Sequence, residues 1–285
     1  MTVETNKQSG NPDETSGLCH ISAGNAQNPK YSIIIPFYNA ERWIGRCADS
    51  LTSQDGAFEF IFVNDHSTDG SLRELINHIG TDGRAKIIEN LGRQGVSAAR
   101  NEGLCGAQGG WITFIDADDE LMPGAWRKFE QLTQTDADIH QSNHLRHFAK
   151  DGTTRRMYGN APGTYELNNL PDLWMPVWNK LYKRELAQNI RFDEEMRYGE
   201  DELYNIEALA KARRIHHGAE YTVMHYIENE ESLSHIKTGD DLARELNKLT
   251  GSMLRHKDPE LRAVIYGLLN VYMATSWYYD AICKR

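Results

Sequence analysis

Short apolar runs alternate with amphipathic stretches between residues 31 and 115. The apolar runs have the length and the Ile, Val and Phe content of buried strands. They span Tyr31–Pro36, Phe58–Val63, Ala85–Glu89 and Trp111–Ile115. Apolar residues three and four positions apart between them predict helices at Ala40–Thr52, Asp69–Ile79 and Ser97–Ala107. This alternation predicts an α/β fold with a Rossmann-like, mainly parallel sheet flanked by helices.

The pattern is less regular beyond residue 138. Apolar periodicity predicts further strands at Asp138–Ser142 and Glu220–Tyr226. It also predicts a helix-rich segment at Leu170–Ala187 and helices at Glu200–Ala212, Asp240–Arg255 and Pro259–Cys283.

The C-terminal run Ala263–Ile282 contains one formal charge, Asp280, and is long enough to cross a membrane. Its tyrosines and its polar residues dilute the apolar character. We therefore favour a packed helix or a homo-oligomer contact over peripheral contact with a membrane. The other end, residues 1–29, is rich in Asn, Ser, Gly, Thr and Glu and is predicted to be a flexible lead.

The bulk composition is that of a globular protein, with 285 residues, 40% apolar, and a formal net charge of −10. General nucleic-acid binders present a basic face, so no nucleic-acid partner is expected. The cysteines show neither a CxxC pair nor disulfide-like spacing; they are Cys19, Cys47, Cys105 and Cys283. This spacing favours a reducing compartment. We therefore expect a cytoplasmic protein, at the inner face of the membrane if the C-terminal run contacts lipid.

Polar side chains follow each of the four predicted strands. In parallel sheets, ligands bind outside the carboxyl ends of the strands, so these side chains should line one cleft. They include Tyr38, Asn39, Asn64, Asp65, His66, Asn90, Arg93, Gln94, Asp116, Asp118 and Asp119.

The fourth strand runs directly into an acidic cluster, Asp116, Asp118 and Asp119. Three carboxylates this close are costly unless a cation neutralises them, and hard oxygen ligands suit Mg²⁺ or Mn²⁺. In an extended segment Asp116 and Asp118 point to the same side, where both could face one ligand. The alternative is a solvated turn that precedes a helix beginning near Pro123.

Six motifs in one order resemble inverting family 2 glycosyltransferases of the GT-A fold, over about residues 31–235. The motifs are IIIPFYNAERWI, FIFVNDHSTDGS, ENLGRQGVSAARNEG, WITFIDADDEL, WNKLYKREL and GEDELYN. The resemblance implies transfer of a sugar from a nucleotide diphosphate donor, most often a UDP-sugar, to a glycan or lipid-linked acceptor in polysaccharide biosynthesis. It also implies a Mn²⁺ or Mg²⁺ cofactor.

The resemblance implies a role for each matching residue on the donor side. Asp116 and Asp118 would form the DxD pair, with Asp118 on the metal and Asp116 toward the ribose or also on the metal. The remaining positions would bind the donor nucleotide or shape its loop, and they are Pro36, Tyr38, Asn39, Asp65 and Arg100. His66 stands where the family usually has a glycine.

Asp201 matches the catalytic base of the family, which takes the proton from the acceptor hydroxyl. The structural alternative is that Glu200 and Asp201 only complement the helix dipole at the start of a helix. Further candidates for the acceptor pocket or a lid are Trp178, Lys180, Glu200 and His225. Loops around residues 150–170 and 228–238 are candidates for a lid that excludes water. Trp178 is equally suited to sugar stacking and to packing. His225 is more often a packed histidine than a metal ligand, and Ile227 replaces an arginine usual in the family.

The resemblance divides the chain into the lead at 1–29, a GT-A catalytic domain at 30–235 and a C-terminal helical extension at 236–285. Within the catalytic domain, residues 30–120 would be the nucleotide-binding half and 121–235 the acceptor half. The main rival is a catalytically inactive GT-A-like module that binds a nucleotide or a glycan. A phosphatase would carry its DxD motif after the first strand, an oxidoreductase would show GxGxxG there, and a nucleotidyltransferase a basic Gly-rich loop.

Overall fold

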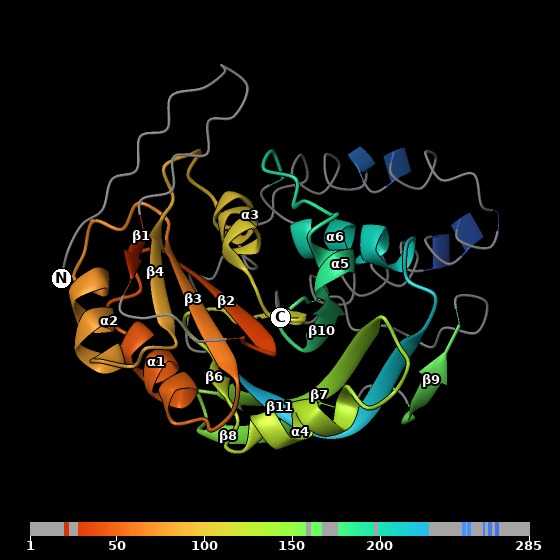
Figure 1. The fold of residues 1–285 in the computed structure, drawn as a ribbon, viewed down its shortest axis with the longest axis horizontal. Helices are drawn as coiled ribbons and strands as arrows, with labels where there is room; N and C mark the ends of the chain where they lie inside the picture. The colour runs from red at the N-terminus through yellow and green to blue at the C-terminus, as the bar shows by residue number, and fades with distance from the viewer. Residues whose placement is uncertain are drawn as a thin grey trace.

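The structure, a computed structural model, describes residues 20–22, 28–157, 161–166, 176–196 and 199–227, and single helical residues between 247 and 267. The N-terminal half builds a parallel sheet in the order β4-β3-β2-β5. Its strands are β2 (Tyr31–Phe37), β3 (Phe58–Asn64), β4 (Ala85–Glu89) and β5 (Trp111–Phe114). Figure 1 shows β4, β3 and β2 side by side. The four strands predicted for this half are confirmed.

Helices cover both faces of this sheet and enclose two apolar cores. One core includes side chains of α1 (Ile44–Thr52), α2 (Ser71–Ile79) and α4 (Ala125–Leu132). The opposite core includes α3 (Val96–Gly106), α5 (Arg184–Ala187) and α6 (Glu200–Leu209). The first helix begins at Ile44 and not at Ala40, because a turn occupies the intervening residues.

The C-terminal half makes the sheet mixed. Strand β10 (Lys180–Lys183) pairs antiparallel with both β5 and β7 (Ile139–Phe148), and β7 pairs parallel with β11 (Ile215–Ile227). The remaining strands pair at the periphery, and they are β1 (His20–Ser22), β6 (Glu120–Leu121), β8 (Thr153–Met157) and β9 (Gly163–Tyr165). The predicted lead thus contains one short strand, β1, paired with β4.

The helix-rich prediction for residues 170–187 is wrong where the structure describes this segment. Residues 180–183 form β10, and helix is confined to α5. Leu181 packs into the core with α1, α2 and α4, whereas Tyr182 packs into the opposite core. This alternation is the period of a strand, and β10 gains ladder hydrogen bonds on both edges.

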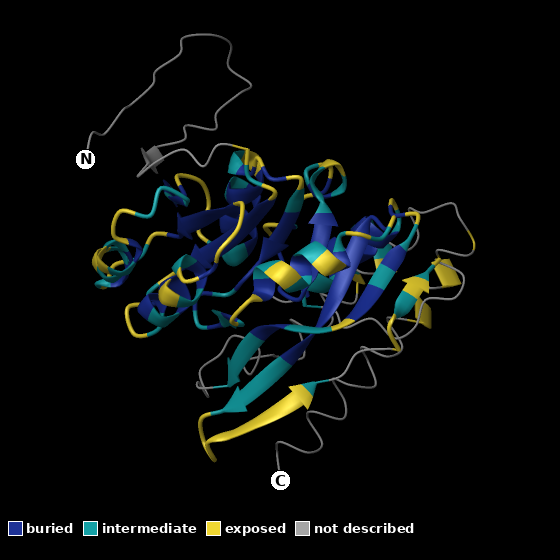
Figure 2. Ribbon diagram, turned by 60° about the horizontal axis from the view of Figure 1, so that its bottom comes forward, coloured by how far each residue is buried: buried dark blue, intermediate teal, exposed yellow. Residues whose placement is uncertain are grey.

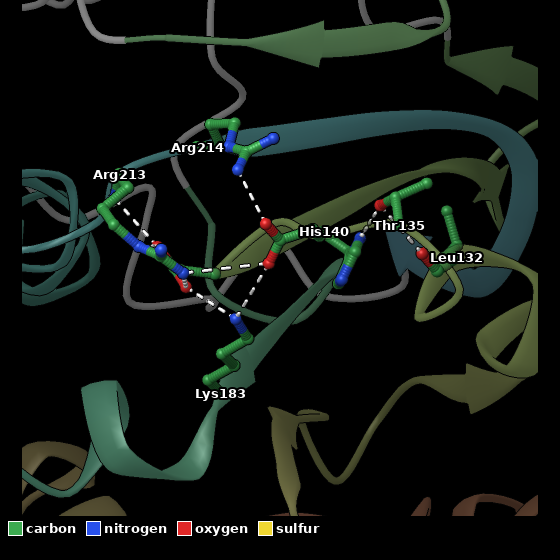
Figure 3. A network of polar contacts seen from close by, with 8 residues as sticks. Leu132, Thr135, His140, Lys183, Arg213 and Arg214 are labelled. Atoms are coloured by element: carbon green, nitrogen blue, oxygen red, sulfur yellow. Dashed lines mark hydrogen bonds and ion pairs between the residues drawn. The ribbon is translucent and has the colours of Figure 1, made fainter.

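A polar network fixes the start of β7 to its neighbours (Figure 3). The Asp138 carboxylate accepts a hydrogen bond from Lys183 Nζ at 2.7 Å and from the Arg213 backbone N–H at 2.9 Å. Burial opposes ionisation of Asp138, but the hydrogen bonds from Arg213 and Lys183 outweigh it and hold its pKa below the usual range. The network therefore joins β10 to the segment that enters β11.

Two predicted regions lie largely outside the described residues. They are the C-terminal helices at 240–283 and the second half of the proposed lid at 228–238. The residues described between 247 and 267 are helical, and Lys248 Nζ lies 2.8 Å from an Asp193 carboxylate oxygen. No helix within the described part of the chain is long and apolar enough to cross a membrane.

Candidate functional site

A buried arginine joins the two acidic motifs of the sequence. Arg100, on α3, is 3% exposed. Its Nη2 lies 3.0 Å from Asp116 Oδ1, and its Nη1 lies 3.1 Å from Glu200 Oε1 and 2.7 Å from Asp201 Oδ1. Burial lowers the pKa of Arg100, but the three carboxylates outweigh it, so the guanidinium stays charged. The strand end after β5 and the start of α6 therefore meet at one cation.

Asp201 lies in the first turn of α6, preceded by Gly199 with a positive φ of 76°. Its Oδ1 accepts from Arg100, and its Oδ2 accepts from the Val177 backbone N–H at 3.2 Å. Burial raises its pKa to about 7, against the attraction of Arg100. A carboxylate has about four lone-pair positions, so Asp201 retains acceptor capacity for a substrate hydroxyl. Its pKa suits a base that works near neutral pH.

The acidic loop after β5 is fixed by the chain on two sides. Asp119 is 0% exposed and accepts hydrogen bonds from the Tyr226 backbone N–H at 2.9 Å and from His225 Nδ1 at 3.0 Å. On the other side, Arg46 Nη2 donates to the Asp118 carbonyl at 2.6 Å. The Arg46 guanidinium also lies 3.6 Å from the centre of the Tyr226 ring. Asp119 therefore fixes the loop, while Asp116 and Asp118 are the carboxylates left toward the site.

Asp118 has the properties of a metal ligand. Burial, together with the charges of Asp119 and Asp116, raises its pKa to about 7. Among the described residues no lysine or arginine forms an ion pair with its side chain, and no three His, Cys, Asp or Glu side chains converge to hold an ion. Mg²⁺ and similar ions are commonly held by one or two carboxylates, with substrate phosphates completing the shell. The residues present fit that arrangement, with Asp118 as the ligand.

Asp65, predicted from the sequence to face the nucleotide, is 5% exposed. Its Oδ1 accepts from Asn90 Nδ2 at 2.6 Å, and its Oδ2 accepts from the Gly95 backbone N–H at 2.9 Å. These contacts fix the loop between β4 and α3 and orient the carboxylate. Each oxygen keeps a lone pair for a nucleobase N–H.

The first loop after β2 depends on Asn39. This residue has a positive φ of 47°, and its Oδ1 accepts from the Thr68 backbone N–H at 2.8 Å. Pro36 is buried in β2, whereas Tyr38 is 51% exposed and available to a ligand. His66 has a φ of 63°, a left-handed conformation that glycine adopts at no steric cost.

The residues predicted for the acceptor pocket or lid are mostly enclosed. Trp178 is 4% exposed, with its ring stacked 5.0 Å from His225 and edge-on at 4.7 Å to His144. Packing is thus its role in this structure. Lys180 is buried, its Nζ donates to the Pro176 carbonyl at 2.6 Å, and burial lowers its pKa to about 7. Lys180 is therefore enclosed in the fold and not part of an exposed loop. His225 contacts Asp119 and so helps to hold the acidic loop.

One supporting residue, Arg46, was missed from the sequence, and the contact made by a second, Asn90, was not foreseen. Arg46 is an ordinary cation on an amphipathic helix until the fold brings it to the acidic loop. Asn90 was counted among the cleft residues, but its hydrogen bond to Asp65 was not foreseen. Only the predicted convergence of strand ends pointed to Asn90, and nothing in the sequence pointed to Arg46.

Comparisons with known proteins point to one family. A family model described as glycosyl transferase family 2 matches residues 32–211. The chain is 33% identical to "Uncharacterized glycosyltransferase EpsJ" of Bacillus subtilis over 228 residues, covering 73% of this chain and 64% of that one. It is 29% identical to the poly(ribitol-phosphate) beta-glucosyltransferase of Bacillus spizizenii, covering 70% and 33%. The chain thus spans between about a third and two thirds of these relatives.

Solved structures share the fold. Staphylococcus aureus TarS, residues 1–349 in complex with UDP-GlcNAc, superposes with a TM-score of 0.73 at 21% identity, covering 86% of this chain and 73% of TarS. The mannosyltransferase PcManGT of Pyrobaculum calidifontis, in complex with GDP-Man and Mn²⁺, gives a TM-score of 0.64 at 14% identity, covering 88% and 72%.

Proposed function

Because the chain belongs to glycosyl transferase family 2 and has the GT-A fold, we propose that it is an inverting, metal-dependent enzyme. It moves a sugar from a nucleoside diphosphate donor, with uridine as the base, to a hydroxyl group of a glycan or lipid-linked acceptor. That the chain is a glycosyltransferase follows from its family and its relatives. The donor, the metal and the stereochemistry are the proposal.

The observation that carries the proposal is the shared ion pairing of Asp116 and Asp201 with Arg100. One carboxylate belongs to the DxD motif and the other is the candidate base. A transfer reaction needs the leaving group and the deprotonated acceptor on opposite sides of one anomeric carbon, held at a fixed separation. A buried cation between the two motifs provides that fixed separation.

Asp201 performs the proton transfer in the proposed reaction. Its carboxylate takes the proton from the acceptor hydroxyl as that oxygen bonds to the anomeric carbon. The bond from the anomeric carbon to the diphosphate breaks in the same step, and the nucleoside diphosphate leaves with the electron pair. A single displacement of this kind inverts the anomeric configuration. The transition state has oxocarbenium character, as in other reactions at an anomeric carbon.

A divalent ion on Asp118, Mn²⁺ or Mg²⁺, would supply electrostatic stabilisation of the diphosphate when bound. Asp119, His225 and Arg46 keep the loop in place for that contact. Arg100 is not free to bind phosphate, because its two Nη atoms pair with three carboxylates. We therefore replace the donor-binding role expected for Arg100 by the positioning of Asp116 and Asp201.

Uridine is supported by Asp65, whose oriented carboxylate can accept the imide N–H of uracil. Tyr38, exposed directly after β2, would cover the base. The fold neighbour TarS was solved with UDP-GlcNAc, which is in keeping with this choice. A cytoplasmic location is supported by the two described cysteines, Cys47 and Cys105, which are free thiols.

The experiment is a calorimetric titration of UDP, GDP and dTDP with and without Mn²⁺, repeated with Asp118→Ala. The proposal expects UDP to bind only when the metal is present, and this metal-dependent binding to be lost in Asp118→Ala. Transfer to oligosaccharide acceptors would then be followed by NMR, where the anomeric coupling constant reports inversion. Binding of a nucleotide without transfer or donor hydrolysis would favour the inactive binding module. A folded protein that binds no nucleotide would reject the donor site.

A further inference from the structure

The hairpin formed by β7 and β8 carries a cluster of basic side chains. Residues 144–157 contain four arginines or lysines and one acid, in a chain with a net charge of −10. The cations are Arg146, Lys150, Arg155 and Arg156, and the acid is Asp151. Figure 2 shows the hairpin at the edge of the sheet, with its outer strand exposed along most of its length.

Strand register places one row of these side chains beside the acidic loop. His225 on β11 is paired with Arg146 on β7, and Arg146 is paired with Arg155 on β8. Directly paired residues share a face of the sheet, so the three form a row perpendicular to the strands. The Arg155 guanidinium lies 4.5 Å from the centre of the Phe148 ring, and Phe148 shares the face of Arg146.

This row begins at the candidate site. His225 contacts Asp119 in the acidic loop and stacks on Trp178. The backbone N–H before Trp178, that of Val177, donates to Asp201. The row therefore leads from the metal and base region outward along one face of the hairpin.

The outer end of the row is open to a ligand. The Arg155 side chain is 62% exposed, and its carboxylate contact is Asp151 at 3.5 Å, itself 47% exposed. Ion pairs of this kind contribute little and are readily exchanged. Arg156 is equally placed on the outer strand but points to the opposite face, with its guanidinium 5.8 Å from the centre of the Tyr221 ring.

We propose that the row His225, Arg146 and Arg155 binds an anionic acceptor chain, a glycan or polyol polymer with repeated phosphodiester or carboxylate groups. The proposal rests on the proposed transferase function, because a chain bound along this row is an acceptor only if Asp201 is the base. A repeating anion matches cations spaced along a surface, and the cations offset its repulsion from the acidic loop. A neutral glycan would gain nothing from this charge.

A lipid surface fits the hairpin less well. Among the described residues, the exposed large apolar side chains are Tyr38, Leu91 and Tyr266, and none lies on the hairpin. Peripheral membrane elements combine cations with inserted apolar groups. The polymer is therefore the occupant that we propose, and the vesicle is the rival to be tested.

The test compares charge reversals on the two faces of one strand. Fluorescently labelled oligomers of poly(glycerol phosphate), polyuronate and neutral dextran are titrated with the full chain and followed by anisotropy at low and high salt. The variants are Arg155→Glu and its matched control Arg156→Glu, with Arg155→Gln as a milder change. Reversal removes one attraction and adds one repulsion, each worth up to about fivefold at an exposed site. We expect Arg155→Glu to weaken binding of at least one anionic polymer about tenfold and Arg156→Glu to change it less than about twofold.

Several outcomes would overturn the proposal. Equal affinity of wild-type protein for dextran and both anionic polymers, or equal losses in the two charge reversals, would mean that the row is not a specific site. Pelleting with phosphatidylglycerol vesicles, without binding to either polymer, would assign the hairpin to a membrane. UDP binding with Mn²⁺ is measured in the same wild-type samples. Failure of UDP binding with intact polymer binding would reject the proposed donor chemistry and leave the row standing as a glycan-binding surface.

Discussion

At the scale of single residues, the site depends on the ionisation of Asp201. Its pKa of about 7 means that the carboxylate is mostly protonated below neutral pH and free to accept a proton above it. We therefore expect kcat/KM to rise about tenfold per pH unit below pH 7 and to level above it. A pH–rate profile checks this, and a flat profile between pH 5.5 and 8 would remove Asp201 as the base.

The role of Asp201 is separable from nucleotide binding. Asp201→Asn keeps the size of the side chain and can still accept from Val177, but it cannot take a proton. Transfer should fall about 10²–10⁴-fold while UDP affinity stays within about threefold. Steady-state kinetics and calorimetry measure the two quantities. A comparable loss of transfer in Glu200→Gln, whose carboxylate contacts the same guanidinium, would point to disruption of the Arg100 contacts and not to loss of the base.

Arg100 itself should matter for stability as well as activity. Replacement by Met leaves three carboxylates around a buried apolar side chain, and removing one partner of a buried ion pair costs about 3–5 kcal/mol. Urea unfolding of Arg100→Met is the measurement. The matched control is Arg73→Met, on a side chain 74% exposed, which should change stability by less than about 0.5 kcal/mol. Equal effects of the two substitutions would contradict the central role of Arg100.

At the scale of elements, α3 carries Arg100 and must lie close to β2. A Cβ at Gly103 would come within 2.3 Å of Ile34 Cγ2, a branched side chain that is fully buried. Gly103→Ala should therefore destabilise the fold by about 1–3 kcal/mol, despite the better helix propensity of alanine. The comparison is Gly106→Ala in the same helix, where the added Cβ lies 3.1 Å from the movable Ile88 Cδ1. The unfolding temperature of Gly103→Ala should be well below that of Gly106→Ala.

Sequence periodicity predicted the elements of the first half well, because its strands are largely buried on both faces and the helices α1 and α2 each have one apolar side. It failed at β10, where Leu181 and Tyr182 face opposite cores within a four-residue strand. So short a segment is compatible with either period. It also missed β8, whose residues are mostly exposed and lack the apolar alternation of a strand with one buried face.

At the scale of the whole molecule, the nucleotide site should couple to global stability. A ligand that binds only the folded state at about 100 times its dissociation constant adds about 2.7 kcal/mol. UDP with Mn²⁺ should therefore raise the unfolding temperature, and Asp118→Ala should abolish the metal-dependent part. Differential scanning fluorimetry measures both. A similar rise with Mn²⁺ alone would mean that the ion binds without the phosphates.

The order of the strands and the contacts between distant motifs could not be predicted from the sequence. Convergence of the strand ends could be predicted from the topology of parallel sheets. The contact of Arg100 with Glu200 and Asp201 could not, because it depends on where α6 packs against α3. The family resemblance pointed to Asp201 as the base but did not indicate that Arg100 would contact it. It also did not indicate whether Trp178 and Lys180 would be buried.

The shared guanidinium also has a thermodynamic consequence for the order of substrate binding. Asp116 and Asp201 contact different nitrogens of one cation, so a donor that draws Asp116 away leaves more of that charge to Asp201. The proton affinity of Asp201 then falls, and protons are released to the buffer. Linkage is reciprocal: the factor by which the donor changes the affinity for an acceptor at Asp201 is also the factor by which that acceptor changes the affinity for the donor. Titrations of UDP in buffers of different ionisation enthalpy would reveal those protons.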